Sequence, residues 1–220
     1  MEKVTNCPEM MDTIQHMGFL PLFDCGISGF SGDELVDPSC RYHLLPDGGW
    51  EWALWKWKGT IVTEGNCVYG KFFAGKAGFI TLEWWPDFCN YRRSRHPKPE
   101  EGTIEDTILL ILRTNRSMIT RELRAACGFT GPKMRSRFDA YVSRLQAACW
   151  VVTEDFVYPH DKHGHPYGWG WSLLTTPEQL YGREACHCPR TPEESFQRIM
   201  EHLSHLLPQA TRKQLEKIIG

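Results

Sequence analysis

Three acidic side chains in a tryptophan-rich stretch are candidates for acid–base chemistry. Six of the nine tryptophans lie between Trp50 and Trp85, and Glu51, Glu83 and Asp87 are found in the same stretch or directly after it. A carboxylate beside an aromatic surface is an arrangement in which enzymes bind a flipped nucleobase and position water for attack. We therefore take these three carboxylates as the candidate catalytic residues.

Two interpretations of the aromatic residues stay open. Residues 50–80 are expected to be mostly strand, which places Trp50 and Trp52 on one face and Trp55 and Trp57 on the other. Aromatic rings on a surface can stack bases, whereas large aromatic residues more commonly build cores. The core interpretation is favoured for most of the tryptophans. The candidates for base stacking are Trp52, Trp55, Trp57 and Tyr69.

A basic segment lies in the middle of the chain. Residues 92–144 contain twelve Lys and Arg and six acidic residues, so this segment carries +6 although the whole chain carries -2. Clustered cations favour contacts with nucleic-acid phosphates, and the alternative is ordinary solvated charge or a protein contact surface. The candidate DNA-binding residues are Arg121, Arg124, Lys133, Arg135, Arg137, Arg144, Lys162 and His163.

Two short motifs do not lead to a cofactor. Residues 70–76 have the glycine and lysine spacing of a phosphate-binding loop, but Ala77 replaces its Ser or Thr, and no amphipathic helix follows. Cys186-His-Cys188 and the histidines of residues 160–165 match no standard zinc spacing. We therefore expect no nucleotide cofactor and no metal.

The basic residues are carried by elements in a recognisable order. Apolar residues at helical spacing predict helices over residues 104–112 and 119–126, and a third that begins near residue 132 and continues to 148. Strands are predicted over residues 150–158 and 167–174, joined by a polar turn. Three helices followed by a β-hairpin wing are typical of a winged helix, a variant of the helix-turn-helix.

The flanking segments predict a mixture of helix and strand. A capping box begins a short helix at Ser31, residues 67–73 and 76–80 form a hairpin around Ala74-Gly75, and residues 82–91 form a short aromatic helix. Two amphipathic helices follow Thr191 and Thr211.

The expected fold class is therefore α+β. We divide the chain into a Trp-rich α/β N-terminal domain with a β-hairpin (1–98), a winged-helix domain (99–182) and a C-terminal helical pair (183–220).

Composition sets outer limits on the class of protein. The 220 residues are 24% charged and 41% hydrophobic, which is globular composition. There is no apolar run of the roughly 20 residues that a membrane helix needs, and the first residues lack the apolar core of a secretory signal. Nine scattered cysteines in a chain of this length predict reduced thiols. We expect a cytoplasmic protein without a membrane partner.

Several segments together resemble a known family. Residues 65–80, 83–93, 155–158 and 164–168 resemble bacterial proteins described as AlkZ-related. That family is similar, in its winged-helix part, to AlkZ-like DNA glycosylases, which remove alkylated or crosslinked bases from duplex DNA. The resemblance implies DNA as the partner of the basic winged helix.

The resemblance supplies no catalytic residue. AlkZ-like glycosylases carry a Gln-apolar-Gln or Gln-apolar-Asp triplet in their N-terminal part, but Gln15 here is followed by His16 and Met17, and the next glutamine is Gln146. Two hypotheses follow. In the first, the protein binds DNA and has a role in repair; if it is an enzyme, it excises damaged bases. In the second, it is a non-catalytic interaction module whose Trp-rich surface binds another protein.

Overall fold

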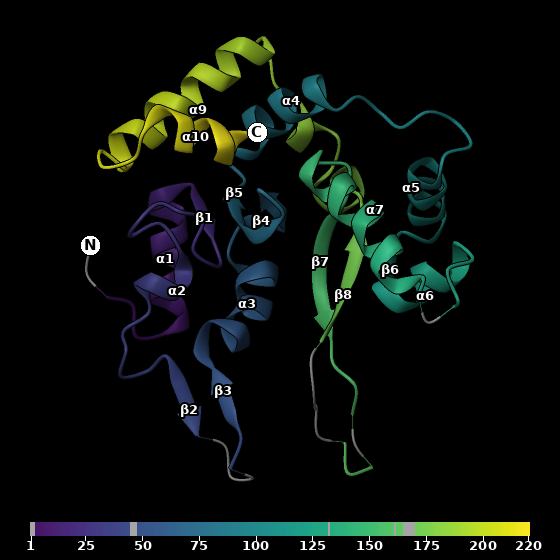
Figure 1. Ribbon diagram of the computed structural model, residues 1–220, viewed down its shortest axis with the longest axis horizontal. Coiled ribbons are helices and arrows are strands. Elements are labelled where there is room, and N and C mark those ends of the chain that lie inside the picture. Colours follow the sequence, from purple (N-terminus) through teal and green to yellow (C-terminus); the bar gives the residue numbers. More distant parts are fainter. Residues whose placement is uncertain (1–2, 45–47, 132, 161, 165–169) are drawn as a thin grey trace.

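The computed structural model describes residues 3–44, 48–131, 133–160, 162–164 and 170–220. These residues form an α+β protein around antiparallel strands, which confirms the predicted fold class (Figure 1). In spatial order the larger sheet consists of β1 (Phe19–Pro21), β5 (Lys76–Thr81), β4 (Cys67–Phe73), β7 (Val152–Val157), β8 (Trp171–Thr175) and β6 (Ser117–Ile119). A separate two-stranded sheet pairs β2 (Tyr42–Leu44) with β3 (Trp50–Trp52).

The predicted hairpin of residues 67–80 is confirmed. Strands β4 and β5 pair antiparallel, and Phe73 lies opposite Lys76 at the turn. Ala74 and Gly75 both have positive φ, at 50° and 82°. Two residues with positive φ form the tight turn whose twist matches that of paired strands, so the local sequence determines this hairpin.

The prediction that residues 50–80 are mostly strand is wrong for its first half. After the short strand β3 the chain forms helix α3 (Ala53–Glu64), so Trp55 and Trp57 do not lie on one face of a strand. The buried side chains of α3 include Leu54, Lys58 and Ile61, which share one helical face. Aromatic residues favour strands only weakly, and burial of this face outweighs that preference.

The helices of the middle segment occur in the predicted order. They are α5 (Ile104–Asn115), α6 (Thr120–Ala126) and α7 (Arg135–Ala147), and β7 and β8 follow them. The short strand β6, which the sequence analysis did not anticipate, lies between α5 and α6 and pairs with β8. Residues 167–169 of the predicted second strand lie outside the described residues.

The remaining helices complete the fold. The capping boxes at Thr191 and Thr211 begin α9 (Pro192–Leu206) and α10 (Arg212–Ile219), as predicted, and the Ser31 hydroxyl caps α2 (Gly32–Leu35). The aromatic helix begins at Trp85, where Pro86 is accommodated in the first turn. These helices are α1 (Cys7–Met17), α2 (Gly32–Leu35), α4 (Trp85–Arg95), α8 (Pro177–Tyr181), α9 (Pro192–Leu206) and α10 (Arg212–Ile219).

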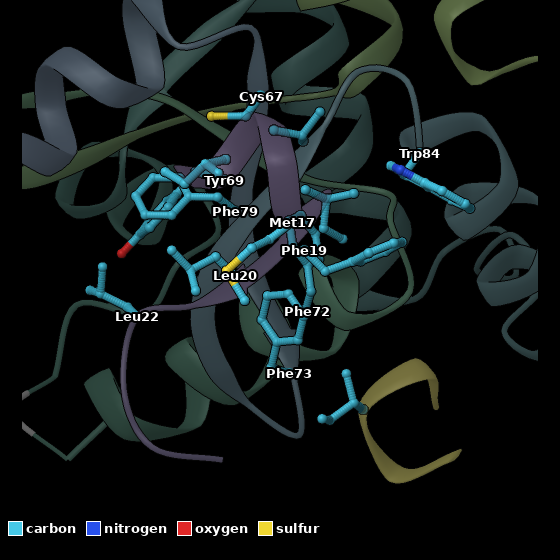
Figure 2. Packing of buried hydrophobic residues seen from close by; sticks show 14 of the residues in the cluster. Met17, Phe19, Leu20, Leu22, Cys67, Tyr69, Phe72, Phe73, Phe79 and Trp84 are labelled. Atoms are coloured by element: carbon cyan, nitrogen blue, oxygen red, sulfur yellow. The ribbon is translucent and has the colours of Figure 1, made fainter. Parts of the chain in front are cut away.

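Two hydrophobic clusters form the core. The larger one packs Phe19, Phe72 and Phe79 of the sheet against α1, α4, α9 and α10 (Figure 2). The smaller one surrounds Phe138 between α5, α6, α7 and β8. The sheet continues between the two clusters, because β4 pairs with β7 through Tyr69 and Thr153. Figure 1 shows α9 and α10 beside α4 at one end of the molecule, far from the β2–β3 hairpin.

Candidate functional site

Three of the predicted DNA-binding arginines line one pocket. Arg121 and Arg124 come from α6 and Arg135 from the start of α7, and Trp171 of β8 completes the wall. The pocket has a volume of about 360 Å³. Its other lining residues are Thr120, Asp139, Gly170 and Ser172. Three guanidinium groups against one carboxylate make this pocket suited to an anionic ligand.

Local contacts position the walls of this arginine pocket. The Thr120 hydroxyl donates to the carbonyl of Ser172 at 2.9 Å, which joins the start of α6 to β8. The Arg121 guanidinium lies 4.7 Å from the centre of the Trp171 ring. Arg135 is 3.8 Å from Asp139 and 77% of its side chain is exposed, so it remains free to contact a ligand. Sequence reasoning placed Trp171 in a strand and did not identify it as part of a site.

The other predicted DNA-binding residues are dispersed. Arg144 pairs with Glu105 at 2.6 Å and lies over the ring of Tyr141. Lys133 and Arg137 are exposed at the start of α7, and Lys162 and His163 are exposed in the connection between β7 and β8. The structure therefore brings Arg121, Arg124 and Arg135 together in one pocket, whereas the other predicted cations are not among its lining residues.

Part of the basic charge of residues 92–144 is not at the surface. Arg92 is only 5% exposed and donates to the carbonyl oxygens of Phe72, Ile218 and Ala147 at 2.8, 3.0 and 3.1 Å. Arg93 pairs with Glu178 at 2.5 Å. The charge of +6 thus overstates what this segment presents to a ligand, because burial and pairing are properties of the folded chain.

The tryptophans differ widely in exposure. Trp85 is fully buried and Trp84 nearly so, whereas Trp50 is 68% exposed. Trp52 is half-buried, with its ring stacked on those of Phe23 and Trp55 at centroid distances of 5.1 and 6.3 Å. The remaining two base-stacking candidates belong to the interior: Trp57 packs half-buried against the larger cluster, and Tyr69 lies within it.

The three candidate catalytic carboxylates lie in two separate places. Asp87 is buried, 2.5 Å from Arg198 and 3.3 Å from Arg190, and accepts a hydrogen bond from the Ser195 hydroxyl at 2.8 Å. Glu83 is exposed and 3.6 Å from Arg198. This cluster between α4 and α9 adjoins an open depression of about 490 Å³ lined by residues of α9.

Glu51 is found on β3 instead, 3.1 Å from Lys56. Its negative charge also affects Tyr158, the residue that follows β7. Burial of the Tyr158 phenol and the charges of Asp155 and Glu51 together raise its pKa. The structure therefore separates Glu51 from Glu83 and Asp87, and places none of the three in the arginine pocket.

Sequence reasoning missed a buried lysine, Lys58, which lies next to the rings of Trp55 and Phe156. Lys58 of α3 has no exposed surface, and its Nζ lies 3.3 Å from the centre of the Phe156 ring and 3.9 Å from that of Trp55. Burial lowers the pKa of Lys58 to about 7, although Asp155 acts in the opposite direction. The available signal was its place between Leu54 and Ile61, on the apolar face of a helix.

Metal ligation and membrane insertion find no support in the described part of the chain. Within it, no three His, Cys, Asp or Glu side chains are grouped so that they could hold a metal ion, and His165 lies outside it. The helices described there are also too short or too polar to cross a bilayer.

The fold and the pocket define an α+β protein with an arginine-lined pocket between α6, α7 and β8. The chain belongs to the AlkZ-related family, whose sequence model matches residues 4–220. By its description the family is related to AlkZ, and so to glycosylase-like proteins of DNA repair. Comparisons with curated proteins and with solved structures give no match.

Proposed function

We propose that this protein binds duplex DNA through a winged helix formed by α5–α7 and β6–β8, within residues 99–182. The observation that carries the proposal is the arginine pocket, which gathers three guanidinium groups and an aromatic ring between α6, α7 and β8. The order of three helices and a strand pair is the one that winged helices use, with the third helix next to the DNA. Arginine binds phosphate through two parallel hydrogen bonds, so the pocket suits a backbone phosphate.

The surrounding cations extend the proposed interface. Lys133 is exposed just before α7, and Arg137 is exposed in its first turn, two residues after Arg135. Lys162 and His163 occupy the position of the wing. Arg144 contributes less, because Glu105 already neutralises it. The relation of the family to AlkZ favours a role in DNA repair.

We expect the Arg121→Gln/Arg124→Gln/Arg135→Gln variant to bind duplex DNA about 10- to 100-fold more weakly than the wild type at low salt. Its log-log salt dependence should be less steep by roughly three, because each lost phosphate contact removes about one released counterion. The measurement is fluorescence anisotropy of a labelled duplex, titrated at two or more salt concentrations.

A matched control separates local contacts from total charge. Replacing Arg212, Lys213 and Lys217 of α10 by glutamine removes the same charge at an exposed helix outside the pocket, and should change affinity less than threefold. Equal weakening by both triple variants, or wild-type affinity that does not depend on salt, would contradict the proposal.

If the protein also excises bases, Glu51 is the candidate catalytic carboxylate that mutation can test. Glu51 is next to Trp52 in strand β3 and only partly buried, whereas Asp87 is enclosed by two arginines. Release of an alkylated base that is abolished by Glu51→Gln would support it. Absence of release by the wild type on a broad panel of lesions would exclude it.

An exposed apolar strip favours a second candidate function, the binding of another protein. On the β2–β3 hairpin Leu44 lies opposite Trp50, and these side chains are 65% and 68% exposed, next to Tyr42 at 54%. Exposed apolar patches commonly mark interaction surfaces. A chain that acts only through this strip would show no salt-sensitive affinity for DNA, so the same titration distinguishes the two functions.

A further inference from the structure

The arginine pocket carries more positive charge than one backbone phosphate neutralises. Three arginines and one aspartate line it, which gives a net charge of +2. Asp139 lies 3.8 Å from Arg135 in an exposed pair, whereas Arg121 and Arg124 form no ion pair among the residues that the structure describes. A phosphate inside a DNA strand carries a single negative charge, so it leaves one positive charge of the pocket unmatched.

The two arginines without a carboxylate partner belong to a wall that is already assembled. Arg124 is half-buried within helix α6, and the Arg121 guanidinium lies 4.7 Å from the centre of the Trp171 ring. The Thr120 hydroxyl joins this end of α6 to β8. Arg135 is the first residue of α7, so the positive end of that helix dipole lies at the same pocket. Groups that are positioned before a ligand arrives lose less conformational entropy when it binds.

A recess of this kind suits the end of a DNA strand. A phosphate inside a strand has a sugar on both sides, so the continuing chain holds it at the rim. A terminal phosphate has a sugar on one side only, and its three free oxygens can enter a pocket of about 360 Å³. A phosphomonoester carries about -1.5 to -2 charges at pH 7, which matches the net charge of the pocket.

We propose that the arginine pocket binds the terminal phosphate of a broken DNA strand, and binds it more tightly than a phosphate inside a strand. This inference rests on the proposed function and deepens it, because the proposed winged helix would bring DNA to the pocket. Arg121 and Arg124 supply the paired N–H donors that guanidinium groups offer to phosphate oxygens. The site thereby distinguishes a strand break from intact duplex.

Fluorescence anisotropy with gapped duplexes tests the proposal. The full-length protein is titrated with labelled duplexes of one sequence that contain a one-nucleotide gap with a 5′-phosphate, with a 3′-phosphate, or with hydroxyl ends only. We expect the wild type to bind at least one phosphorylated gap about 10-fold more tightly than the hydroxyl gap at the same salt concentration. Equal affinity for all three duplexes would overturn the proposal.

Variants locate the preference in the pocket. Arg124→Gln removes a guanidinium without a carboxylate partner, and should reduce the preference for the phosphorylated gap to about twofold or less. Arg121→Gln should act in the same direction at an exposed position, so the test does not depend on the folding of one half-buried variant.

The matched control is Arg137→Gln, which removes an exposed charge of α7 outside the lining of the pocket. It should weaken the binding of all three duplexes by the same factor, so the preference for a phosphorylated gap stays as in the wild type. A preference that both pocket variants retain, or that Arg137→Gln also removes, would contradict the assignment to this pocket.

Competition distinguishes a strand end from a free nucleotide. A deoxynucleoside 5′-monophosphate offers the same terminal phosphate without the duplex. We expect it to displace the phosphorylated gapped duplex only at concentrations about 100-fold or more above those of unlabelled duplex, because it makes no contact with the surrounding cations. Displacement at concentrations similar to those of the duplex would assign the pocket to a free nucleotide and overturn the assignment to DNA.

The outcome for strand ends is separate from that for duplex binding. The intact duplex measures the proposed function, and the ratio of affinities for phosphorylated and hydroxyl gaps measures the new inference. Salt-sensitive binding of intact duplex with equal affinity for all gaps overturns only the preference for strand ends. A preference for a phosphorylated gap without measurable affinity for intact duplex overturns only the winged-helix proposal.

Discussion

Replacing Lys58 by methionine should stabilise the protein, and should do so more at low pH than at high pH. Methionine fills a similar volume without a charge, whereas the lysine carries the cost of burying an ammonium among aromatic rings. The pKa of Lys58 in the folded state, about 7, lies below its value in the unfolded chain, so the unfolded state binds the extra proton between those two values.

The wild type therefore gains stability relative to Lys58→Met as pH rises from 7 towards 10, and is at its greatest disadvantage below pH 7. Each unit of pKa difference corresponds to about 1.4 kcal/mol, and cation–π attraction offsets part of the total. We expect the stabilisation by Lys58→Met to be about 3–5 kcal/mol larger at pH 6 than at pH 10.

Urea unfolding of both proteins at pH 6, 8 and 10 measures this difference. The exposed Lys56→Met variant serves as the control and should change the free energy of unfolding by less than about 0.5 kcal/mol at every pH. A stabilisation by Lys58→Met that does not depend on pH would show that Lys58 keeps the pKa of an exposed lysine.

Replacing Asp87 by asparagine should destabilise the fold by roughly 2–4 kcal/mol. The Asp87 carboxylate is buried and contacts the guanidinium groups of Arg198 and Arg190 and the hydroxyl of Ser195. Asparagine has nearly the same shape but removes the counter-charge of Arg190 and the nearer of the two carboxylates beside Arg198, and loss of one partner from a buried ion pair is costly. Part of that cost is relieved because the arginines are themselves 31% and 44% exposed.

The matched control is Glu83→Gln, which removes another carboxylate next to Arg198. Glu83 is 70% exposed and 3.6 Å away, so its loss should cost about 0.5 kcal/mol or less. Urea unfolding at pH 7 compares the two variants. Equal stability of Asp87→Asn and the wild type would show that the pair contributes nothing to folding. Because Asp87→Asn is expected to destabilise the fold, loss of excision activity in that variant would not show that Asp87 is catalytic. Glu51→Gln is the better test of catalysis.

Features that depend on neighbours in the sequence were predictable. Three such features depend on residues only a few positions apart. They are the caps at Thr191 and Thr211, the turn at Ala74-Gly75, and the apolar spacing of α5, α6 and α7. Their physical basis is the hydrogen bonding of chain ends, positive φ and helical periodicity. The sequence by itself thus determined the fold class, the order of the three middle helices and of the strand pair that follows them, and the segment that carries the arginines, but not strand β6.

Tertiary structure decided which side chains meet. Trp55 and Lys58 lie on a helix because burial of one face of α3 outweighed the strand preference of its aromatic residues. Lys58 meets Tyr158, and Asp87 meets Ser195, across about a hundred residues. Arg92 is not a surface cation, because its guanidinium is buried and donates a hydrogen bond to the carbonyl oxygen of Phe72. Such contacts depend on how distant elements pack, and packing is a property of the whole chain that no local pattern encodes.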